Sequence, residues 1–168
     1  MSHNEKKRRG RMASVICRLF GWIILLGVIA ALVPVTVPRF MGYEIYNVVS
    51  GSMEPEMPVG SIAYVKVIDP VMLEDGEIAA YATEGSVIMH RVVSNHKVEG
   101  YLITKGDANE DEDIKEVQYA NVRGRVVKYY PVIGQLMMLL ANTLGKVLLL
   151  CLALCGVLLN VIAGRMRE

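Results

Sequence analysis

Three residue types that cooperate in hydrolysis occur in the middle of this 168-residue chain, in the order serine, histidine, aspartate. Ser52 comes first, His90 follows, and Asp107 and Asp113 lie further along. A serine becomes a nucleophile when a base takes its proton, a third group orients that base, and nearby donors stabilise the oxyanion. Ser50 lies two residues before Ser52, so in an extended segment both hydroxyls point to the same side. These residues favour a serine hydrolase.

The segment around Ser52, "NVVSGSMEPEMPVGS" over residues 47–61, also has the composition of a plain turn. Gly51 permits a sharp bend, and Pro55 keeps Glu54 extended directly after the candidate nucleophile. The pattern is not the Gly-x-Ser-x-Gly elbow of α/β-hydrolases, because position 54 is Glu and no helical periodicity follows. Taken alone, this segment leaves both interpretations open.

The two histidines of the middle region each have an ordinary explanation. His90 lies in the apolar run "VIMHRVV", where a buried imidazole needs only a hydrogen-bond partner, and His96 lies in "SNHKVEG", which predicts a solvated turn. Two histidines six residues apart indicate no third metal ligand. The acidic stretch "KGDANEDEDI" lacks the spacing of the twelve-residue calcium loop. We therefore expect no metal and no cofactor, and we expect most of these carboxylates to be solvated.

The region that must position these residues is predicted to be a compact, mainly β module. Between Pro38 and Pro131 no segment has a sustained helical period, and short runs rich in β-branched and aromatic residues alternate with turn residues. Gly124 is expected at a β-bulge within the last run. The predicted strands are "SIAYVKV" (61–67), "EIAAYAT" (77–83), "VIMHRVV" (87–93), "GYLIT" (100–104) and "VRGRVVKYY" (122–130).

Two apolar blocks, Leu19–Val37 and Val132–Ala163, flank the module and account for much of the 53% hydrophobic content. The first is long enough to cross a bilayer core of about 30 Å, and Lys146 divides the second. We expect a transmembrane helix on each side, with an interfacial segment before the second. The predicted divisions are a basic N-terminus (1–18), a helix (19–37), an extracytoplasmic catalytic β domain (38–131), an interfacial apolar segment (132–145), a helix (146–164) and a tail (165–168).

Charge predicts the orientation of these helices. Residues 1–37 hold six basic residues and one acidic residue, residues 38–131 hold nine basic and fifteen acidic, and residues 132–168 hold three basic and one acidic. Because basic flanks stay on the cytoplasmic side, both termini are expected there and the acidic module outside. A nucleic-acid-binding arm and a cleaved signal peptide are the alternatives for the first segment, and we expect no nucleic-acid partner.

Five short motifs together resemble type I signal peptidases of the endoplasmic-reticulum type, which also occurs in archaea and some Gram-positive bacteria. They are "SGSMEP", "MHRV", "TKGDAN", "VRGRVV" and "PVIG", and the resemblance runs from Ile45 to Gly134. The histidine in "MHRV" assigns the subtype, because bacterial housekeeping relatives have lysine there. "VGS" (59–61) and "DGE" (75–77) have Ser and Glu where relatives often have Asp, which puts local turns in doubt and leaves the motif residues unaffected.

The resemblance implies a role for each candidate residue. Ser52 is the nucleophile, His90 occupies the place of the general base, and Asp113 lies at the third catalytic position. Ser50 and the backbone N–H of Ser52 would donate to the oxyanion. Asp107 matches a second functionally important aspartate, and because it follows Gly106 near a strand end, we expect it to accept backbone N–H bonds and shape a turn.

The resemblance also implies the substrate: secretory preproteins, cleaved after small residues at −1 and −3 and held as an added strand. The lipid bilayer is an expected partner, and accessory membrane subunits or translocation machinery stay open as others. Two alternatives are an inactive two-helix membrane adaptor with an acidic extracytoplasmic domain and a serine hydrolase of soluble substrates. The predicted substrate-binding residues are Ile45, Tyr46, Val48, Val49, Val87, Ile88 and Met89.

Overall fold

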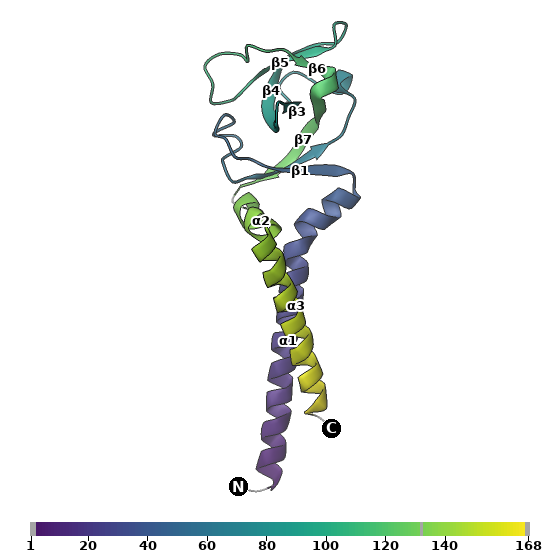
Figure 1. Ribbon diagram of the computed structural model, residues 1–168, viewed down its shortest axis with the longest axis vertical. Coiled ribbons are helices and arrows are strands. Elements are labelled where there is room, and N and C mark those ends of the chain that lie inside the picture. Colours follow the sequence, from purple (N-terminus) through teal and green to yellow (C-terminus); the bar gives the residue numbers. More distant parts are fainter. Residues whose placement is uncertain (1–2, 132, 167–168) are drawn as a thin grey trace. The chain divides into compact units, whose positions relative to one another are not determined.

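The computed structural model describes residues 3–131 and 133–166 and contains two compact units (Figure 1). One unit lies within Met1–Pro34 and Leu139–Glu168, and the other is Val35–Met138. The elements are α1 (His3–Phe40), β1 (Tyr43–Asn47), β2 (Ile62–Lys66), β3 (Ile78–Thr83), β4 (Ser86–His96), β5 (Tyr101–Lys105), β6 (Val117–Gln118), β7 (Val122–Tyr130), α2 (Ile133–Ala141) and α3 (Thr143–Arg165), with short 3₁₀ turns at Pro70–Met72 and Tyr119–Asn121.

In the first unit, α1 and α3 run antiparallel and in contact (Figure 1). The Ser14 hydroxyl donates to the carbonyl of Ala163 across the pair at 2.7 Å. A Cβ on Gly21 would come within 2.8 Å of the Gly156 carbonyl oxygen, so a small residue is needed there. Arg11–Pro34 and Thr143–Arg165 are long and apolar enough to cross a membrane by length and composition.

The second apolar block is interrupted at Asn142, whose side chain accepts the N–H of Gly145 at 2.7 Å and begins α3. The structure therefore breaks this block four residues before Lys146, which lies inside α3. Within the second unit, Met137 of α2 is buried against Ile62 and Tyr64 of β2. Part of the segment expected at the membrane interface thus packs on the sheet.

The second unit is a seven-stranded antiparallel sheet in the order β1-β2-β7-β3-β4-β5-β6, which confirms the mainly β prediction. All five predicted strands are present, and β1 and β6 join them at the two ends. Alternation divides the side chains between two faces: Val65, Ala80 and Met89 share one core cluster, whereas Tyr81 and Val92 belong to another.

A bulge interrupts the pairing of β3 with β7 beside Gly124, as the sequence predicts. Ala80 pairs with Gly124 and Tyr81 with Val122, so Arg123 has no partner on β3. Gly124 has a φ of 153°, and a side chain there would collide with the carbonyl of Lys66 on β2. The bulge therefore requires glycine and turns the residue beside it out of the ladder.

Candidate active site

Ser52 lies in a loop that is closed on itself by backbone bonds. The N–H of Val48 donates to the carbonyl of Ser61, and the N–H of Gly60 donates to that of Val48, both at 2.9 Å. Met53 and Met57 are fully buried and anchor the loop in the core. The apolar positions of "SMEPEM" thus hold the loop, while Ser52 between them stays half-buried.

Two contacts place Ser52 relative to its surroundings. The hydroxyl oxygens of Ser50 and Ser52 lie 3.3 Å apart, so both hydroxyls face the same side. The carbonyl of Ser52 accepts the N–H of Ala108 at 2.9 Å. Ala108 belongs to the acidic loop, residues 106–116 between β5 and β6. A Cβ on Gly106 would come within 2.6 Å of the Ser52 carbonyl oxygen, so the two loops touch through backbone.

His90 of β4 and Asp113 of the acidic loop form a short polar contact, 2.6 Å between Nδ1 and Oδ2. His90 is buried, with 7% of the residue's surface exposed. An ionised carboxylate only accepts hydrogen bonds, so Nδ1 carries the proton and donates it. Nε2 is then the unprotonated nitrogen and can act as a base.

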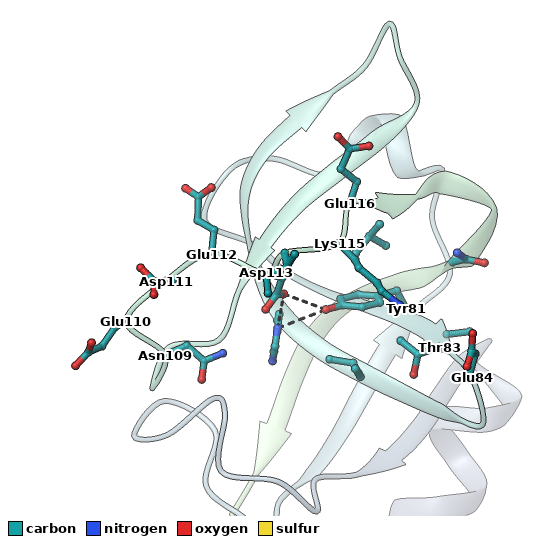
Figure 2. A pocket seen from close by; sticks show the side chains of 16 residues that line it. Tyr81, Thr83, Glu84, Asn109, Glu110, Asp111, Glu112, Asp113, Lys115 and Glu116 are labelled. Carbon is teal, nitrogen blue, oxygen red and sulfur yellow. Dashed lines mark hydrogen bonds and ion pairs between the residues drawn. The ribbon is translucent and has the colours of Figure 1, made fainter.

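Two further hydroxyls donate to the same oxygen of Asp113. Thr104 Oγ1 donates at 2.6 Å and the Tyr81 hydroxyl at 3.2 Å, and Figure 2 shows the latter beside the histidine contact. The N–H of Asp113 also donates to the carbonyl of Thr104 at 2.8 Å. Thr104 is fully buried and Tyr81 nearly so. Asp113 is therefore fixed through both its backbone and its carboxylate.

The Tyr81 hydroxyl stays protonated over a wide pH range. Burial raises its pKa, the contact with Thr104 lowers it, and the nearby charge and hydrogen bond of Asp113 raise it again, to about 12 in all. Tyr81 consequently remains a hydrogen-bond donor to Asp113 at every pH at which a histidine base would operate.

Asp107 has a different partner from the backbone N–H groups that we expected. Arg91 donates to both of its oxygens, Nε to Oδ1 at 2.7 Å and Nη2 to Oδ2 at 2.5 Å. Arg91 also donates to the carbonyl of Gly76 at 2.7 Å. These hydrogen bonds to Asp107 raise the pKa of Arg91. Asp107 thus clamps the acidic loop to β4, one residue beyond His90.

The structure brings His90 and Asp113 together and attaches the Ser52 loop to the loop that carries Asp113. Among the described residues no hydrogen bond joins Ser52 to His90. Catalytic hydrogen bonds are often long before substrate binds and shorten in the complex. The site thus contains His90, oriented by Asp113, and Ser52, whose backbone carbonyl is hydrogen-bonded to the acidic loop that carries Asp113.

A groove of about 500 Å³ lies between β1 and the β3–β4 hairpin. β1 pairs only with β2, and β4 pairs with β5 only from Arg91 onward, so in the described residues one edge of β1 and one edge of Ser86–His90 carry no strand. The groove is lined by Tyr46, Asn47, Val49, Ala82, Thr83, Gly85, Ser86, Val87 and Arg123.

The seven predicted substrate-binding residues divide into two groups. Tyr46, Val49 and Val87 line the groove. The side chains of the other four pack elsewhere: Ile45 against the Ile62 and Tyr64 cluster, Val48 and Met89 in the main core, and Ile88 in the Tyr81 cluster.

Sequence reasoning did not identify Tyr81, Thr104 or Arg91 as members of the site. Arg91 directly follows the histidine and Thr104 lies two residues before Gly106, so both fell within recognised motifs, whereas Tyr81 carried no signal beyond strand alternation. A second cavity of about 1160 Å³ borders His90, Tyr81 and the acidic loop (Figure 2). His96, expected in a solvated turn, instead ends β4 and stacks on Tyr101 with ring centroids 4.5 Å apart.

Comparison with known proteins shows several relatives, although no family model matches the chain. Signal peptidase I W of Bacillus subtilis is 37% identical over 92 residues, which cover 52% of this chain and 48% of that protein. The signal peptidase complex catalytic subunit SEC11 of Komagataella phaffii is 32% identical over 131 residues, 67% of this chain and 76% of that protein. SEC11 of Saccharomyces cerevisiae is 34% identical over 102 residues, 52% and 59%. The chain spans about half the length of the first of these relatives.

The raised pKa of Tyr81 predicts a specific loss of stability at high pH. Because the pKa is about 12 in the folded protein and about 10 in an unfolded chain, the stabilising contribution is complete below pH 10 and falls as pH rises toward 12. The free energy of unfolding of the unmutated protein, minus that of Tyr81→Phe, should decrease by on the order of 2 kcal/mol across this range. Denaturant unfolding at pH 8 to 12 measures it, and a constant difference would contradict the buried hydroxyl.

Proposed function

This chain belongs to the type I signal peptidase family, and we propose that it is a membrane-anchored serine endopeptidase that removes signal peptides from secretory preproteins. The observation that carries the proposal is the 2.6 Å contact between His90 Nδ1 and Asp113 Oδ2. It supports a base at Nε2, oriented by a carboxylate whose loop also binds the main chain of Ser52. This is the division of labour that serine hydrolysis needs.

The proposed reaction proceeds through an acyl-enzyme. Ser52 Oγ attacks the carbonyl carbon of the last signal-peptide residue while Nε2 of His90 takes the serine proton. The negative charge that develops on the carbonyl oxygen is stabilised by the hydroxyl of Ser50 and the N–H of Ser52. The imidazolium, stabilised by Asp113, gives its proton to the leaving amine as the peptide bond breaks. Water, activated by the same histidine, then releases the signal peptide from Ser52.

The groove between β1 and the β3–β4 hairpin is the proposed site for the segment before the cleaved bond. A peptide could add as a strand along the unpaired edges of β1 and Ser86–His90. Tyr46, Val49 and Val87 would contact its side chains, and residues at −1 and −3 would be small. The small groove volume supports an extended occupant.

The membrane topology is part of the proposal. We place residues 19–37 and 146–164 in the bilayer, the catalytic domain 38–131 outside the cytoplasm, and both basic flanks, 1–18 and 165–168, in the cytoplasm. Residues 132–145 would connect the catalytic domain to the membrane interface. The SEC11 relatives are named as subunits of a complex, and accessory membrane subunits are therefore proposed as partners of this chain.

Purified protein in detergent should convert a preprotein into mature protein with the correct amino terminus. Ser52→Ala and His90→Ala should each reduce the rate to near background, because members of such a triad act as a unit worth up to about 10⁶ in rate. Amino-terminal sequencing of the product measures the cleavage site. Substantial cleavage by folded Ser52→Ala protein would contradict the nucleophile assignment.

Ser50→Ala should be less severe than loss of the nucleophile. An oxyanion donor acts in the transition state, so kcat should fall by about 10²–10³ with little change in KM. Steady-state kinetics on the same preprotein measure kcat and KM separately. Unchanged kcat would mean that the oxyanion donor lies elsewhere.

The two aspartates should respond differently to the same substitution. Asp113→Asn should keep its melting temperature and lose most of kcat, because an amide favours the wrong tautomer of His90. Asp107→Asn should lower the melting temperature as well as activity, because it leaves Arg91 without its carboxylate, at a cost of about 1–3 kcal/mol. A fully active Asp113→Asn protein refutes the assignment, and if a folded Asp107→Asn protein is then dead, the two roles are exchanged.

Protease accessibility tests the topology. In cells or vesicles of known orientation, protease on the extracytoplasmic side should cut the acidic loop near Glu110, which is exposed. Tags on either end of the chain should stay protected. Digestion of a tag after Glu168 from outside would show that the second helix does not span.

A further inference from the structure

Arg123 lines the proposed substrate groove, and in the described part of the chain no carboxylate is paired with it. Among the hydrogen bonds and ion pairs of the described residues, none involves its side chain, and the residue is exposed. Other cations of β7 differ: Arg125 pairs with Glu77, and Lys128 lies over the ring of Tyr130. The groove therefore presents a guanidinium group without an ion pair among the described residues.

The fold accounts for the placement of this side chain. Arg123 is the residue that the β3–β7 ladder skips at the bulge beside Gly124. Bulges redirect a side chain away from the regular alternation and are common next to functional sites. Here the redirected side chain reaches the groove that also holds Tyr46, Ser86 and Val87.

The residues that line the groove offer the cation no counter-charge. None of its lining residues carries a carboxylate. Glu44, the carboxylate beside Tyr46 on β1, instead accepts the Tyr46 hydroxyl at 2.5 Å. As a whole, residues 38–131 carry fifteen acidic against nine basic residues, which would repel an acidic peptide. The cation in the groove is thus a local exception to the charge of its domain.

We propose that Arg123 forms a subsite for an acidic side chain of the substrate, four or five residues before the cleaved bond. This inference rests on the proposed function, which places the segment before the cleaved bond in the groove. Val87 and Ser86 lie three and four residues before His90, about 10–13 Å along an extended strand. A residue three or four positions upstream of −1 would therefore reach them, at −4 or −5. A planar guanidinium matches a carboxylate with two parallel hydrogen bonds.

A peptide series tests the subsite directly. Peptides with small residues at −1 and −3 carry Glu, Gln or Lys at one position at a time from −6 to +2. The unmutated protein should cleave the Glu peptide about three- to fivefold faster in kcat/KM than the Gln peptide at −4 or −5 and nowhere else, since exposed ion pairs are weak. Salt at about 1 M should remove the preference, because it screens exposed charges.

Two variants separate the subsite from the general charge of the domain. Arg123→Glu should reverse the preference, so that the Lys peptide is cleaved faster than the Glu peptide at the same position. Arg123→Gln should abolish the preference for Glu. Lys97→Glu, in the turn between β4 and β5, changes the net charge by the same amount as Arg123→Glu. It should keep the preference for the Glu peptide. Equal preference in the unmutated protein and Arg123→Gln, or loss of preference in Lys97→Glu, overturns the subsite. If the unmutated protein cleaves none of the peptides or preproteins, the proposed function itself fails and takes this inference with it.

Discussion

The hydrogen bond between His90 and Asp113 is the contact on which the site depends. It joins residues 23 apart in sequence, from the middle of β4 and from the acidic loop. A carboxylate that is partly withdrawn from water needs donors to offset the lost hydration, and Thr104 and Tyr81 supply them from β5 and β3. Removing either donor would loosen the carboxylate that orients the imidazole. The order of β3, β4 and β5 in the sheet is therefore also a condition for an oriented base.

A second constraint acts on the nucleophile through packing. Met53 and Met57 are buried while Ser52 is not, so the hydrophobic core holds the loop and leaves the hydroxyl accessible. The ion pair between Arg91, the residue after His90 on β4, and Asp107 holds the acidic loop to the strand. Two independent attachments, one through the Ser52 carbonyl and one through Arg91, thus fix the acidic loop between nucleophile and base. Rigid placement of this kind is what catalysis by proximity requires.

Much of this could be predicted from the sequence, because strand alternation and motif order are local properties. The five strands, the bulge beside Gly124 and the candidate residues all follow from short segments. The role of Tyr81 could not be predicted in this way. Strand alternation indicates which face of the sheet its side chain occupies, but not which residues of other elements it contacts there. The local sequence of Asp107 favours a turn and therefore backbone partners, whereas the fold brings the Arg91 side chain within reach. Likewise, the charge of Lys146 predicts that the second membrane helix begins there. In the structure α3 begins at Thr143, because Asn142 can cap it.

The central claim is that Asp113 fixes the proton of His90 on Nδ1 and leaves Nε2 as the base. The chain has three histidines, so nitrogen NMR of histidine-labelled protein in detergent at neutral pH, with His90→Ala for assignment, tests it directly. The account predicts that neutral His90 shows a protonated Nδ1 and an unprotonated Nε2, and that Asp113→Ala abolishes this preference. A neutral His90 protonated on Nε2 in the unmutated protein would contradict it.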